Sequence, residues 1–174
     1  MGTLGPTIAN AASMGPRYAQ RLLTGITAER FARCAAPGGE MIMANHPAFV
    51  IGHLCLYPTK VVSLLGGDTA AVTPPAAFDT AFSKEASCQD DPDGSHYPSQ
   101  QEVVDFFTAS YAAAIEAVRN ASDETLAAPN PVDTPLKDVL PTLGSMLAFY
   151  LTSHVMMHLG QLSTWRRMEK LPPA

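Results

Sequence analysis

Apolar residues recur along most of the chain at the three-and-four spacing that is typical of amphipathic helices. The first such segment covers residues 5–24, and its apolar face consists of Ile8, Ala11, Gly15, Tyr18 and Leu22. Gly15 and Pro16 interrupt this pattern, so we expect either a kink at Pro16 or a regular helix that begins there with Ser13 near its cap. Gly25 lies where the helix should end.

The second helical segment is the apolar run over residues 47–65. Asn45 or His46 is expected to cap it, because Pro47 follows at a position that suits the first helical turn. Pro58 lies inside the segment and should bend it. The pair Gly66-Gly67 marks its end.

Two further helices are predicted in the second half of the chain. Ser99 should cap a helix that continues to about Asn120, with Glu102 completing a capping box. The buried face of that helix is predicted to be Val104, Phe107, Tyr111, Ala114 and Val118. The fourth helix is expected from about 142 to 169, and one of its faces carries Leu147, Leu151, His154, His158, Gln161 and Trp165.

Residues 67–98 lack strong periodicity and are rich in Pro, Asp, Ser and Gly. A connection of this length is typical of a crossover, a lid or a binding loop. We find no internal repeat and no alternation typical of strands. The chain is therefore predicted to be one all-α domain over residues 1–174, a four-helix bundle with a long crossover connection between the second and third helices.

Composition narrows the possible classes of protein. Hydrophobic residues make up 47% of the chain, which excludes a disordered protein, and the net charge of −5 argues against a nucleic-acid partner. We expect no apolar run to reach the roughly 18 residues that span a bilayer, and the first residues do not resemble a secretory signal, so neither a membrane partner nor export is expected.

The sulfur-containing residues favour a reducing compartment and a packed core. Cys34, Cys55 and Cys88 are odd in number and form no C-x-x-C pair, which indicates a cytoplasmic protein without a disulfide framework. Cys55 is expected in the core, whereas the other two lie in loops where they could be exposed. Three methionines of the fourth helix are predicted to fill the core: Met146, Met156 and Met157.

Two histidines four residues apart are the strongest chemical signal in the chain. His154 and His158 begin and end "HVMMH" on the apolar face of the fourth helix, and two imidazoles on successive turns can reach one ion. His53, beside Gly52 in "FVIGHLCL", is the best candidate for a third ligand. A histidine on an apolar face is often only a core residue with a hydrogen-bond partner, and that alternative stays open.

Other catalytic sites fit the sequence poorly. A zinc protease helix needs Glu directly after its first His, and that position here is Val155. A di-iron bundle needs Glu-x-x-His pairs, and a serine hydrolase needs G-x-S-x-G; neither pattern occurs.

Taken together, "NHPAFVIGHLCLYP" and the downstream "HVMMHLGQLSTWRR" resemble the DinB/YfiT-like superfamily of bacterial metalloenzymes, and the resemblance covers nearly the whole chain. It implies a helical bundle with a crossed helix order. It also implies a divalent metal, zinc or nickel, on His53, His154 and His158, with Gln161 as an adjacent polar residue. Some relatives are transferases or isomerases that act with low-molecular-weight thiols, and homodimers are common among them.

Four residues are candidates for polar groups around the metal ligands: Gln161, His46, Asn45 and Tyr57. For each of them, capping or packing is the competing interpretation. The favoured function is metal-dependent transfer or isomerisation with a thiol cosubstrate and a small-molecule substrate. The rival hypotheses are a non-catalytic ligand-binding or interaction bundle, and a metal that is structural or absent.

Overall fold

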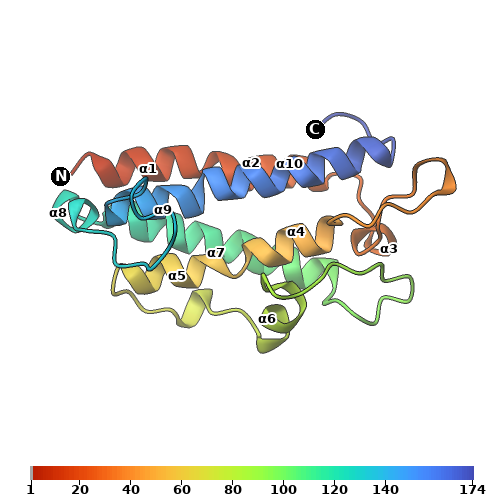
Figure 1. The fold of residues 1–174 in the computed structure, drawn as a ribbon, viewed down its shortest axis with the longest axis horizontal. Coiled ribbons are helices and arrows are strands. Elements are labelled where there is room, and N and C mark those ends of the chain that lie inside the picture. Colours follow the sequence, from red (N-terminus) through yellow and green to blue (C-terminus); the bar gives the residue numbers. More distant parts are fainter. Residues whose placement is uncertain (1) are drawn as a thin grey trace.

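The fold is four helical columns packed side by side, seen in a computed structural model that describes residues 2–174 (Figure 1). Three of the columns are each built from two consecutive helices and one is a single long helix. In chain order the columns are α1 (Leu4–Ala12) with α2 (Met14–Leu23), α4 (Pro47–Leu54) with α5 (Tyr57–Leu64), α7 (Gln100–Asn120), and α9 (Leu143–Leu151) with α10 (Ser153–Met168). The all-α prediction is confirmed, because the described residues form helices and no strand beyond two isolated β-bridges.

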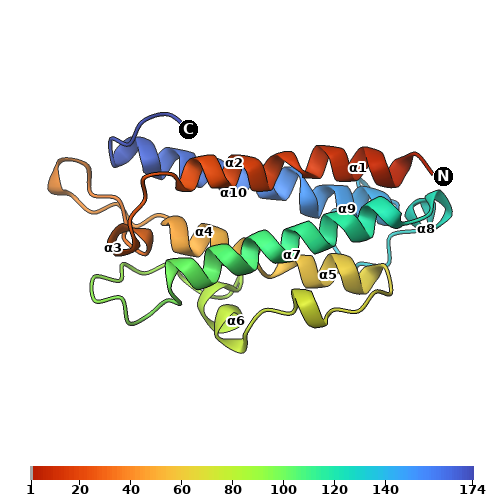
Figure 2. The same cartoon turned by 180° about the vertical axis from the view of Figure 1, so that it is seen from behind.

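The second and third columns run in the same direction, and the first and fourth run opposite to them (Figures 1 and 2). Two parallel columns need a connection that returns along the length of the bundle, which explains the long segment between α5 and α7. The first column packs on α7 and on the fourth column, and the second column packs on the same two. The predicted crossed order and crossover are therefore correct.

The remaining short elements lie in the connections. They are α3 (Ala28–Phe31), η1 (Pro37–Gly39), η2 (Ala70–Val72), α6 (Ala76–Phe82) and α8 (Asp123–Ala127). The helix α6 was not predicted, because its 7 residues, about two turns, show too little periodicity to be recognised. It packs against α4 and brings Phe82 onto Gly52, where a Cβ atom would lie 2.4 Å from the phenyl ring. The glycine thus permits the close helix approach that its place beside His53 suggested.

Three breaks divide the columns. The first falls at Ser13, just before the Gly15-Pro16 pair, and the backbone stays helical through it with φ −62° and ψ −16°. The second falls at Cys55 and Leu56, immediately before Pro58, as that proline predicted. The third falls at Thr152 with φ −122° and ψ −79°, and no proline or glycine marks it in the sequence. The single fourth helix expected over 142–169 is therefore two helices.

Side chains cap the helices largely where the sequence placed them. Ser99 accepts a hydrogen bond from the backbone N–H of Glu102, as predicted, although no returning bond from the Glu102 side chain is present. Thr142 and Ser145 form a reciprocal capping box at the start of α9. Gly25 ends α2 with φ +80°, a left-handed conformation that favours glycine.

Several burial predictions are corrected by the structure. Met156 and Met157 are 44% and 56% exposed rather than buried, because the turn of α10 points them away from the bundle, while Met146 is in the core. Cys34 is buried, although it lies in a loop, whereas Cys55 is in the core as expected. On α7, Val103 rather than Val104 belongs to the buried face.

The segment Pro47–Leu64 has the length and hydropathy of a membrane-crossing helix, contrary to the expectation from the apolar runs. In the fold, 67% of it is buried inside the bundle. It is also interrupted between α4 and α5. Its apolar character therefore serves the bundle core.

Candidate metal centre

Three histidines from two columns converge where α4 faces α10. His53 lies in the last turn of α4, and His154 and His158 lie on successive turns of α10. The ring centroid of His53 lies 5.5 Å from that of His154 and 4.7 Å from that of His158. One ring nitrogen of each residue lies within 4.8 Å of a ring nitrogen of each of the other two. The structure thus brings together the three residues that the sequence singled out.

The carbonyl of Phe82 fixes the orientation of His53. His53 Nδ1 lies 2.8 Å from this carbonyl oxygen, so Nδ1 must carry the proton and donate. The remaining nitrogen, Nε2, then offers its lone pair. A backbone carbonyl on the non-ligating nitrogen is a recurrent device for orienting metal-bound histidines.

His154 and His158 present the same nitrogen to each other, with their Nε2 atoms 3.1 Å apart. Without a cation, only one of these two Nε2 atoms can donate to the other, and the buried Nδ1 atoms of both rings have no hydrogen-bond partner among the described residues. Two nitrogens bound to one zinc ion at about 2.0–2.1 Å and near-tetrahedral angles lie about 3.4 Å apart. The residues present therefore fit a divalent metal.

All three imidazoles favour the neutral form that a metal requires. Burial is the main cause that lowers the pKa of His154 to about 3, and the neighbouring His158 and His53 contribute to this shift. Burial is also the main cause of the lowered pKa of His53 and of His158. The cluster is neutral at pH 7, so no proton has to leave before a cation binds.

Tyr57 is the one further candidate that contacts the cluster. Its ring centroid lies 4.1 Å from that of His154 and 5.3 Å from that of His53. Burial raises the pKa of its phenol, and the nearby Tyr150 raises it further. Tyr57 is therefore a protonated hydroxyl group beside the histidines at pH 7.

Gln161 and Asn45 reach the edge of the cluster and bind each other. The amide nitrogen Nδ2 of Asn45 donates to Oε1 of Gln161 over 3.0 Å. Gln161 also favours the charged form of His158, against the larger effect of burial on that pKa. The side chain of Gln161 is exposed, so the face shared by Gln161 and the histidines does not face the core along its whole length.

His46 takes no part in the cluster and caps α4 instead. Its Nδ1 accepts from the backbone N–H of Phe49 at 3.2 Å, and its Nε2 donates to the carbonyl of Gln89 at 2.9 Å. Both nitrogens are thereby used. Of the two interpretations of His46, capping is correct.

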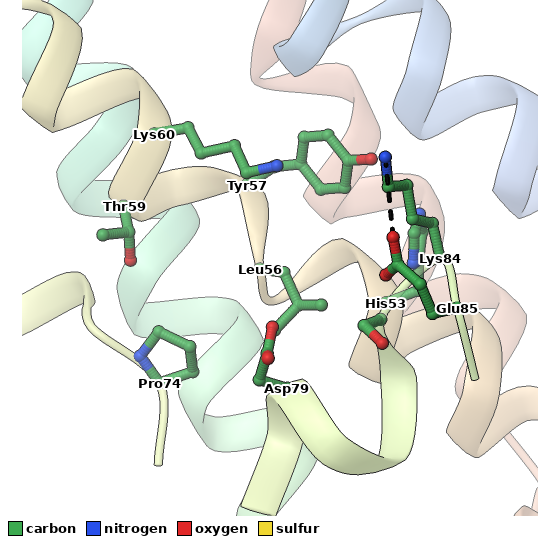
Figure 3. A pocket seen from close by; sticks show the side chains of 10 residues that line it. His53, Leu56, Tyr57, Thr59, Lys60, Pro74, Asp79, Lys84 and Glu85 are labelled. Carbon is green, nitrogen blue, oxygen red and sulfur yellow. Dashed lines mark ion pairs between the residues drawn. The ribbon is translucent and has the colours of Figure 1, made fainter. Parts of the chain in front are cut away.

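A cleft of about 260 Å³ reaches the cluster from the side of His53 (Figure 3). Its walls come from α4, α5 and α6, and from the residues that follow α6. The polar and charged residues around it are Tyr57, Thr59, Lys60, Asp79, Ser83, Lys84 and Glu85. The crossover over 67–98, which the sequence left open as a lid or binding loop, thus forms one wall of the cleft.

Sequence reasoning missed the residues that shape the surroundings of the histidines. The Phe82 carbonyl could not be found from residue type, because any residue supplies a carbonyl. Lys60 lies seven residues after His53, close to the same face of the column, and this spacing could have indicated it.

Among the described residues, no Cys, Asp or Glu joins the three histidines as a fourth ligand. Structural zinc sites are closed by four protein ligands, whereas catalytic sites commonly have three and leave one position to water or substrate. The donor set and the adjacent cleft therefore match the catalytic type.

Comparison with known proteins supports the same assignment. No curated protein and no solved structure matches the chain. The pattern of the DinB superfamily, in contrast, matches residues 13–162, which include all three histidines and run from the start of α2 into the second half of α10. The chain belongs to the DinB superfamily.

Proposed function

We propose that this protein is a divalent-metal-dependent enzyme of the thiol-transferase or isomerase type. His53, His154 and His158 would hold the metal, with zinc or nickel as the expected ion. The observation that carries the proposal is a cluster of three neutral imidazoles, with no fourth protein ligand among the described residues, at the end of a cleft. Resemblance to thiol-dependent relatives supports the reaction class.

Bound there, the metal would supply Lewis acidity, which polarises a substrate oxygen or lowers the pKa of a thiol. The protein's own groups would orient the reactants. Tyr57 offers a phenolic O–H next to the histidines, and the Phe82 carbonyl keeps His53 in one tautomer. Lys60 and Lys84 place positive charge along the cleft.

The reaction class is tested by following the transfer of a small thiol to an aryl chloride with the metal-loaded protein. We expect turnover in the wild type and in His96→Ala, which removes an exposed histidine outside the cluster. His53→Ala should abolish it. If all three proteins behave alike, or if loaded wild type is inactive with every thiol tried, the non-catalytic binding protein becomes the better hypothesis.

We further propose that the protein is a cytoplasmic homodimer. The exposed side chains of Met14, Met156 and Met157 on α2 and α10 support a face that a second copy would cover. The three free thiols agree with a reducing compartment. Sedimentation of the purified protein, compared with Met156→Lys, tests the dimer.

A further inference from the structure

The cleft contains one lysine that no carboxylate neutralises. Lys84 pairs with Glu85 at 3.5 Å, whereas Lys60 has no carboxylate within ion-pair distance in the part of the chain that the structure describes. The ammonium of Lys60 instead lies over the ring of Tyr57, 4.9 Å from its centroid. Such a cation–π contact leaves the charge available to a ligand.

The charge of Lys60 acts on the histidine cluster. It contributes to the lowered pKa of both His53 and His154, after the larger effect of burial. The ring of Tyr57 contacts both the ammonium of Lys60 and the ring of His154. A molecule that occupied the cleft beside the histidines would therefore meet the positive field of Lys60.

The size and donors of the cleft restrict what this charge would recognise. A volume of about 260 Å³ is below the roughly 300–1,000 Å³ of pockets that take drug-sized ligands. The single uncompensated ammonium balances the single charge of a carboxylate, whereas a phosphate monoester carries about 1.5 to 2 negative charges at pH 7. The exposed Asp79 would disfavour ligands with several negative charges.

We propose that the cleft takes a small substrate that carries a carboxylate, and that Lys60 binds this carboxylate while the reacting end of the molecule lies at the histidine cluster. The inference rests on the proposed function, because it assumes a metal at the cluster. Lys60 is then a specificity-determining residue.

The test uses cobalt(II)-loaded protein and two thiols of equal length, mercaptopropionate and mercaptopropanol. The dissociation constant of each is measured from the visible absorption of cobalt. We expect mercaptopropionate to bind about three- to tenfold more tightly than the alcohol, and this preference should shrink as ionic strength rises. Lys60→Met should remove the preference, and Lys60→Arg should retain most of it.

A control variant separates Lys60 from a general charge effect. Lys137→Met removes an exposed lysine in the connection before α9. It should keep the preference. Equal affinities of the two thiols in the wild type, or an unchanged preference in Lys60→Met, would overturn the inference while cobalt uptake upholds the metal site. Wild-type protein that takes up no cobalt would overturn both proposals.

Discussion

At the scale of single residues, the partners of its ring nitrogens indicate whether a buried histidine is a candidate metal ligand or an ordinary core residue. His46 is buried, and both of its nitrogens are satisfied by backbone groups. His154 and His158 are packed in a comparable setting, yet their Nε2 atoms face each other, 3.1 Å apart, beside His53 rather than facing backbone groups. One divalent ion can bind a nitrogen of all three rings. The contrast therefore favours a metal at the cluster over ordinary core packing.

We expect the titration of His46 to make the folded protein less stable in mild acid. Burial lowers its pKa from 6.5 to about 4, and protonation of Nδ1 would break the cap of α4. Above pH 6.5, His46 makes its full contribution to the free energy of unfolding. As the pH falls from 6.5 to 4, the unfolded chain takes up a proton that the folded chain does not, so up to about 3 kcal/mol is lost.

Urea unfolding of metal-free protein between pH 7 and pH 4 measures this loss. The buried cluster histidines titrate with the same sign, so the informative quantity is the difference from His46→Asn, which keeps a capping side chain without titrating. We expect the variant to lose less stability over this range. If the free energy of unfolding fell equally with pH in the two proteins, His46 would not be the cause of the lost stability.

At the scale of elements, the contact between α4 and α6 supports the site. Gly52→Ala would drive a Cβ atom into the ring of Phe82, whose carbonyl orients His53. We expect a loss of about 1–3 kcal/mol in the free energy of unfolding, together with weaker metal binding, roughly 10–100-fold. Thermal unfolding and metal titration measure the two effects.

Gly160 on α10 provides the matched control for Gly52. No atom lies within 4 Å of the position of its Cβ, so Gly160→Ala should stabilise the helix by roughly 0.5–1 kcal/mol. If both alanine variants changed stability alike, close packing at Gly52 would not be the cause.

Arg166 joins two elements and the end of the chain. Its guanidinium is buried and donates to the carbonyls of Leu22 and Thr24 at the end of α2, and to that of Pro172. Arg166→Met should cost about 2–4 kcal/mol, because three carbonyls lose a charged donor, whereas the exposed Arg167→Met should change little. The free energy of unfolding in denaturant, measured for both variants, tests this difference.

The pattern of apolar residues predicted the helical columns, most of their ends and the three histidines, because periodicity and capping are local properties. It did not predict the break at Thr152 or the short helix α6, since neither has a local signature strong enough to recognise. The apolar pattern also failed to predict that Met156 and Met157 are exposed. Which face of a helix is covered depends on how the columns pack, and that is settled only in the assembled bundle.

At the scale of the whole molecule, the parallel second and third columns make the site possible. The crossover between them runs past α4, so that α6 supplies both the carbonyl behind His53 and a wall of the cleft. The fourth column then closes the cluster with His154 and His158. The three histidines, their support and the cleft thus come from three segments that are far apart in the sequence.

The central claim is that this bundle holds one divalent metal on three histidines. It is tested most directly by elemental analysis of protein purified without a histidine tag, comparing the wild type with His154→Ala and His96→Ala. The account predicts close to one zinc or nickel per chain in the wild type and in His96→Ala, and almost none in His154→Ala. Equal metal content in all three proteins, or a metal-free wild type after incubation with either ion, would contradict it.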